Sequence, residues 1–81
     1  MNIVVEFVNV SSKTSVDLLI PSDISAQELI EGLNEAYHLA LDMNDPAQTY
    51  LYSEKPVALV RGAVTLEELG IRNGSILYYD R

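Results

Sequence analysis

The sequence predicts an α+β fold in which one helix packs on a mixed sheet, with elements in the order strand, strand, helix, strand, strand, strand. Three observations support this prediction. Two segments of alternating apolar residues open the chain, a capped amphipathic helix follows, and short apolar runs separated by turn residues complete it. The 81 residues suffice for a single domain, expected over 1–81, and without cysteine the apolar residues, 48% of the chain, must stabilise it.

Residues 2–10 and 14–21 are expected to form a hairpin. In the first strand we assign the row with Phe7 to the core and the row with Glu6 to solvent, because a large aromatic ring belongs in a core and a carboxylate in water. The second strand ends at Pro21, which lacks a backbone donor. The residues expected to face the core are Ile3, Val5, Phe7, Val16, Leu18, Ile20, Leu77 and Tyr79.

The helix start is specified by Ser25 and Glu28, which have the spacing of a capping box, and by Ile24 and Leu29, which have that of a hydrophobic staple. Gly32 lies within the helix, where glycine costs about 1 kcal/mol relative to alanine, and this predicts a close approach to the sheet. The apolar stripe of the helix is Leu29, Ile30, Leu33, Ala36, Tyr37 and Ala40, with Tyr37 expected in the core.

The second half of the chain is expected to contain two strands, at 49–53 and 57–61, and a final strand at 75–79. The sequence does not determine which face Tyr50, Leu51 and Tyr52 occupy. A one-turn helix is expected to place Leu66, Leu69 and Ile71 beneath the sheet, and Asn73-Gly74 supplies the tight turn into the last strand.

Composition argues against several classes of function. Twelve acidic and five basic residues give a net charge of −7, which disfavours nucleic acid and anionic lipid and favours a basic or neutral protein partner. The N-terminus lacks a basic signal-peptide region and no apolar run approaches the roughly 20 residues that cross a bilayer, so a cytoplasmic protein without membrane insertion is expected.

No catalytic set, metal site or cofactor is predicted, so we expect a protein that is not an enzyme. His38 is expected to be solvated or to cap the helix, since no acid or nucleophile is placed near it by spacing. Asp42, Asn44 and Asp45 lack the spacing of a calcium loop and are expected to form a loop that ends the helix.

The element order, the step Pro21-Ser22-Asp23 into the helix and the run from Leu66 to Gly74 resemble the β-grasp of the ubiquitin superfamily. Within it, the whole chain most resembles the YukD/EsaB proteins of type VII secretion systems, which place a segment like 16–20 before the helix. The resemblance implies a non-catalytic accessory or adaptor protein that binds a cytoplasmic component of the secretion machine. The acidic opening of the helix, 25–28, departs from the family, so no functional residue is transferred.

The strand alternation predicts where a partner docks. The β-grasp places the first strand between the second and the fifth, so the outward alternates of these strands should meet on the face away from the helix. A contiguous apolar patch there favours a docking surface, although β-branched and aromatic residues also suit strands wherever they point. The predicted protein-binding residues are Val4, Val8, Leu19, Ile76 and Tyr78, with Glu6 and Asp17 on the same face.

Two other functions remain open. One is a small ubiquitin-like, non-catalytic subunit of a multicomponent enzyme such as a diiron monooxygenase. The other is a conjugated modifier or sulfur carrier, which the sequence disfavours because it ends in Asp80-Arg81 without a glycine pair. A symmetric homodimer through the apolar face is also open.

Overall fold

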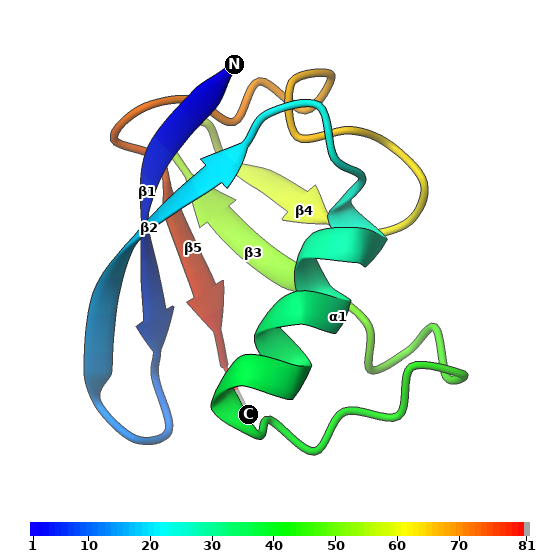
Figure 1. The fold of residues 1–81 in the computed structure, drawn as a ribbon. Coiled ribbons are helices and arrows are strands. Elements are labelled where there is room, and N and C mark those ends of the chain that lie inside the picture. The colour runs from blue at the N-terminus through cyan, green and yellow to red at the C-terminus, as the bar shows by residue number, and fades with distance from the viewer. Residues whose placement is uncertain (81) are drawn as a thin grey trace.

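The computed structural model describes residues 1–80 and has the predicted order of elements. In this part of the chain one helix lies across one face of a sheet of five strands, which gives two layers (Figure 1). The ββαβββ order and the mixed sheet confirm the predicted fold class. The elements are β1 (Asn2–Asn9), β2 (Thr14–Pro21), α1 (Ala26–Tyr37), β3 (Leu51–Glu54), β4 (Ala58–Val60) and β5 (Ile76–Tyr79).

The strands lie in the order β2-β1-β5-β3-β4, which confirms the predicted position of the first strand between the second and the fifth. β1 and β5 are parallel, and the other neighbouring pairs are antiparallel. The turn before β5 holds β1 at Val4: the backbone N–H of Val4 donates to Asn73 Oδ1 (2.8 Å), and the N–H of Gly74 donates to the carbonyl of Val4 (2.9 Å). Gly74 has a φ of 88°, which suits glycine.

Both ends of α1 are fixed by local hydrogen bonds. The predicted capping box is present, with the N–H of Glu28 donating to Ser25 Oγ (3.1 Å) and the N–H of Ser25 donating to Glu28 Oε1 (3.3 Å). His38 caps the C-terminus in a left-handed conformation, as expected of a structural histidine. Beyond it, the hydroxyl of Tyr79 donates to the carbonyl of Leu39 (3.1 Å), which ties the following loop to β5.

The core lies between α1 and the sheet, and most of the predicted inward row belongs to it. Val16 faces the helix side beside Phe7 as predicted but is 40% exposed, and the assignment of Tyr37 to the core is wrong, since Tyr37 is 42% exposed. Both line the same hollow between the β1–β2 hairpin and the end of α1, so their outer sides are uncovered, although the ring of Tyr37 still packs against Phe7 at a centroid distance of 5.5 Å. The buried apolar residues are Ile3, Val5, Phe7, Ile20, Ala26, Leu29, Ile30, Leu33, Leu39, Leu41, Leu51, Val60, Leu66, Ile71, Leu77 and Tyr79.

The predicted close approach at Gly32 is wrong. Gly32 is exposed, and a Cβ built on it would meet no atom within 4 Å. Ala36, also assigned to the apolar stripe, is exposed, and Ala40 lies beyond the end of the helix. Small residues therefore leave one flank of α1 open to solvent.

Gly32→Ala is expected to raise the free energy of unfolding by about 1 kcal/mol, because alanine is the better helix former and its methyl group meets free space. Urea unfolding followed by far-ultraviolet circular dichroism measures the change. The matched control is Gly74→Ala, which forces a positive φ on alanine and should destabilise the protein. A loss of stability with Gly32→Ala would mean that this flank of the helix is not open.

The segment before β5 differs from the expected one-turn helix. Residues 66–70 form turns, because Gly70, with a φ of 82°, ends the helical path after one bond from the N–H of Leu69 to the carbonyl of Thr65 (3.1 Å). Leu66 and Ile71 are buried beneath the sheet as predicted. Hydrogen bonds from the backbone and side chain of Thr65 hold the pKa of Glu68 below its ordinary value.

The loop after α1 uses its acidic residues for local structure. Asp42 Oδ1 accepts from the N–H of Asn44 (3.0 Å), and Asp45 Oδ1 accepts from the N–H of Ala47 (3.0 Å). These are the bonds of short polar turns. They agree with the predicted role of this segment as a loop that ends the helix.

Candidate docking face of the sheet

The face of the sheet away from α1 carries two neighbouring rows of side chains. The strand register places Val8 beside Tyr78, Tyr78 beside Tyr52, and Tyr52 beside Leu59. We call these four residues the apolar row, and they cross β1, β5, β3 and β4. One step along the strands, the register aligns the acidic row, which is Asp17, Glu6, Ile76 and Glu54.

The five predicted residues occupy this face in two groups. Val8, Ile76 and Tyr78 are half-buried neighbours on β1 and β5. Val4 pairs with Leu19, which is 69% exposed, on the other side of the acidic row. The carboxylates of Glu6 and Asp17 therefore interrupt the patch that the alternation predicted, and the face combines apolar and acidic rows.

Sequence reasoning missed two members of the apolar row. Tyr52 and Leu59 are exposed, and the register joins them to Tyr78. The run Tyr50-Leu51-Tyr52 has no charged residue that would mark the solvent side, so the face of Tyr52 could not be predicted from the sequence. The structure resolves the three residues: Leu51 is buried, Tyr50 is half-buried, and Tyr52 meets Tyr50 edge to face with centroids 5.4 Å apart.

The hydroxyl of Tyr78, in the apolar row, interacts electrostatically with Glu54 and Glu6 of the acidic row. Partial burial first, then the charge and hydrogen bond of the Glu54 carboxylate and finally the charge of Glu6, raise the pKa of Tyr78 above its ordinary value. The raised pKa favours the neutral phenol in the folded protein. The associated stabilisation is therefore present at neutral pH and is lost as the pH rises through the pKa of the folded state.

Glu54→Gln is expected to lower the pKa of Tyr78 toward its ordinary value, because the amide removes the negative charge beside the hydroxyl while burial and Glu6 remain. A pH titration of the tyrosine ring signals by NMR measures this. Glu31→Gln, on the exposed side of α1, is the control and should leave the titration of Tyr78 unchanged. An unaltered Tyr78 pKa in Glu54→Gln would contradict the proximity of the two side chains.

A shallow depression of 480 Å³ opens on the same side of the sheet, where Val4, Glu6, Asp17, Asn73 and Gly74 contribute to its lining. It combines two carboxylates with an exposed valine. This chemistry suits the aliphatic stem and charged head of a lysine or arginine, which cover apolar surface while placing a cation beside an acid.

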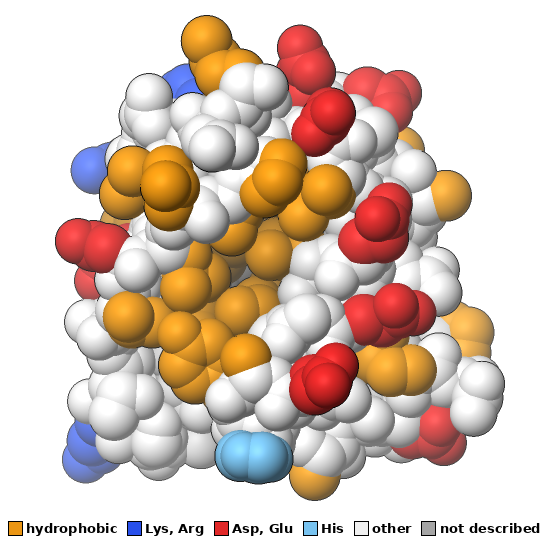
Figure 2. Space-filling view, in the orientation of Figure 1, with side chains coloured by type: hydrophobic (Ala, Val, Ile, Leu, Met, Phe, Trp, Pro, Cys, Tyr) orange, Lys and Arg blue, Asp and Glu red, His pale blue; other side chains and the backbone are white. Residues whose placement is uncertain are grey.

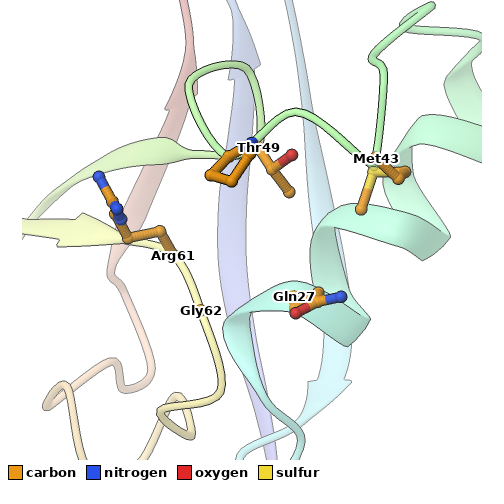
Figure 3. Close-up of a pocket in the computed structure, with 6 residues that line it drawn as sticks. Gln27, Met43, Thr49, Arg61 and Gly62 are labelled. Atoms are coloured by element: carbon orange, nitrogen blue, oxygen red, sulfur yellow. The ribbon is translucent and has the colours of Figure 1, made fainter.

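A second hollow, of 250 Å³, lies between the start of α1, the following loop and the end of β4. Figure 3 shows Gln27, Met43 and Thr49 around it, with the guanidinium of Arg61 directed away from Gln27 and Met43. These residues include no pair of nucleophile and base. Across residues 1–80, no group of three or more histidine, cysteine or acidic side chains is placed to hold a metal ion.

Solved structures similar to this one are ubiquitin-like. A designed protein based on ubiquitin shares 16% identity over 95% of this chain and 84% of its own, with a TM-score of 0.67. The ubiquitin-like domain of Plasmodium falciparum Dsk2 shares 18% identity over 96% and 97% of the two chains (TM-score 0.62). The C-terminal ubiquitin-like domain of mouse tubulin-specific chaperone e shares 11% over 99% and 86% (TM-score 0.73). At these identities the likeness establishes the fold alone, a ubiquitin-like β-grasp.

Sequence comparison identifies the family. No curated protein matches the sequence at a significant level. No membrane-spanning helix can be assigned within residues 1–80, because none there has the necessary length and hydropathy. The family model described as "WXG100 protein secretion system (Wss), protein YukD" matches residues 3–78. The chain therefore belongs to the YukD family, a ubiquitin-like family associated with the WXG100 secretion system.

Proposed function

We propose that this protein is a non-catalytic accessory or adaptor protein of a bacterial type VII (Wss) secretion system, and that it acts in the cytoplasm by binding another protein without covalent conjugation. The observation that carries the proposal is the apolar row, which crosses four strands on the sheet face away from α1. Solvent faces of antiparallel sheets are normally polar, and contiguous exposed apolar residues mark interaction sites. Membership of the YukD family favours secretion over the monooxygenase alternative.

The two rows support a partner of a particular chemistry. The apolar row favours a partner with an apolar centre. Two of its members, Tyr78 and Tyr52, are tyrosines, one of the residue types enriched at interface hot spots. Glu6, Asp17 and Glu54 border this row and favour lysine or arginine at the rim. Val4 and Leu19 extend the contact beyond the acidic row.

The proposal is tested by affinity purification of tagged protein from its own host, under native and fully denaturing conditions in parallel. Recovery of cytoplasmic secretion-apparatus proteins under native conditions, and their loss after denaturation, would support a non-covalent adaptor. Partners that survive denaturation would overturn non-covalent binding. Native recovery of an oxygenase, without secretion proteins, would overturn the secretion role.

A further inference from the structure

The sheet has one long open edge. Among the strands of residues 1–80, β2 has β1 as its one neighbour, so alternate backbone N–H and C=O groups along its eight residues point away from the sheet. The other edge strand, β4, has three residues. Short edge strands limit unwanted pairing, whereas a long open edge is a template for an added strand. β2 is therefore the edge at which a strand of another protein can pair.

An apolar groove accompanies this edge on the helix side. Val16 and Leu18 face inward from β2 but are only partly covered, and Phe7 and Tyr37 continue the apolar surface beneath and beside them. Figure 2 shows the resulting hydrophobic strip between β2 and α1. At the hairpin end the groove widens into a cavity of 310 Å³, lined by Phe7, Val16 and Tyr37 together with polar hairpin residues.

The helix leaves this groove open because its two flanks differ. One flank is occupied: Asn34 bonds the backbone of Leu41 (2.9 and 3.1 Å), and the N–H of Gln27 donates to the carbonyl of Gly62 beyond β4. The opposite flank, toward β2, carries Gly32 and Ala36, one turn apart and both exposed. A Cβ at Gly32 would meet nothing within 4 Å. An added strand beside β2 therefore has room for its side chains.

The rim of the groove is acidic along the helix. Glu28 and Glu35, one turn before and one turn after Gly32, are exposed on α1, and Figure 2 shows acidic side chains following the helix to one side of the hydrophobic strip. On the hairpin side of the groove, Lys13 at the hairpin tip is basic. The acidic side chains therefore border the groove on the helix side. A second copy of this chain would bring an equal net charge of −7 and another acidic rim to the contact. Charge therefore favours a basic partner over self-association.

We propose that the β2 edge and the β2–α1 groove bind an extended segment of a partner protein as a sixth strand, with alternate apolar side chains in the groove and flanking lysine or arginine beside the acidic helix. Main-chain bonds to β2 supply affinity, and the groove with its rim selects the sequence. This surface lies on the helix layer, opposite the docking face of the sheet. A failure of this proposal would therefore leave the function proposed above unaffected, and a failure of that function would leave this proposal unaffected.

The test is an NMR titration of isotope-labelled protein with two capped linear peptides that share an alternating valine–isoleucine centre and differ in their flanks, lysine in one and glutamate in the other. The lysine-flanked peptide should shift the amides of β2 and the methyl groups of Val16 and Leu18, and should protect β2 amides from hydrogen exchange. It should bind at least about tenfold more tightly than the glutamate-flanked peptide and should weaken as salt is added.

Two substitutions at one position locate the site. Gly32→Gln places a long side chain in the groove and should weaken the lysine-flanked peptide at least about tenfold, whereas Gly32→Ala should leave the affinity within about twofold. Both residues form helix better than glycine, so folding is not at risk. The proposal is overturned if the two variants bind alike, if the shifts fall on Val8 and Tyr78, if the two peptides bind equally, or if added peptide only drives self-association.

Discussion

Leu77→Ala is expected to lower the free energy of unfolding by about 2–5 kcal/mol, the cost of removing a large aliphatic side chain from a packed core. Leu77 is 0% exposed and lies on β5 at the centre of the sheet, where its neighbours in the register are Phe7 on β1 and Ser53 on β3. The whole free energy of unfolding of a natural domain is about 5–15 kcal/mol, so this one substitution removes a large fraction of the stability.

Urea unfolding of the wild type and Leu77→Ala, followed by circular dichroism, measures the loss. The matched control is Val57→Ala, at a side chain that is 89% exposed, which should change the stability by less than about 0.5 kcal/mol. Equal stabilities of Leu77→Ala and Val57→Ala would contradict the placement of β5 as the central strand against the helix.

Tyr78→Lys is expected to weaken binding of the secretion partner by about 30-fold or more, because interface tyrosines often contribute at least about 2 kcal/mol. The lysine breaks the apolar row between Val8 and Tyr52. It also places its ammonium group beside Glu6 and Glu54, whose charges act on Tyr78 in the native protein. The folded state should therefore tolerate the lysine better than an aspartate.

Calorimetric titration of the purified partner with the wild type, Tyr78→Lys and Tyr78→Asp measures the effect, with urea unfolding as the check on folding. Val64→Lys is the control, because Val64 is exposed in the loop that bonds the start of α1 and lies outside both rows. Wild-type affinity in folded Tyr78→Lys would exclude the apolar row as the docking site.

The sequence predicted the elements that strong local signals specify. Ser25 and Glu28 form the capping box, and the alternation around Phe7 gave the correct inward row for β1. Pro21 and the Asn73-Gly74 turn marked strand boundaries to within a residue or two. These signals act over a few residues, so the sequence alone carries them.

The errors concern how far one element covers another. Val16 and Tyr37 have the right periodicity for the core, but β2 is an edge strand and both side chains border the open hollow between it and the end of α1. Periodicity does not encode how far the helix covers the sheet. Gly32 was interpreted through its cost in a helix, whereas its surroundings are open. At the docking face, alternation placed Val4, Val8, Leu19, Ile76 and Tyr78 on one side of the sheet. Only the register shows that Glu6 and Asp17 divide them and that Tyr52 and Leu59 extend the row.

The most direct test of the central claim, that this YukD-family protein binds a secretion component through the outward sheet face, is photocrosslinking in the host with benzoylphenylalanine in place of Tyr78. The same probe at Val64 is the control, since that loop lies outside the docking face. We predict that irradiation joins position 78, and not position 64, to a cytoplasmic protein of the secretion apparatus identified by mass spectrometry. Crosslinks to that protein from position 64 alone, or from neither position, would contradict the account.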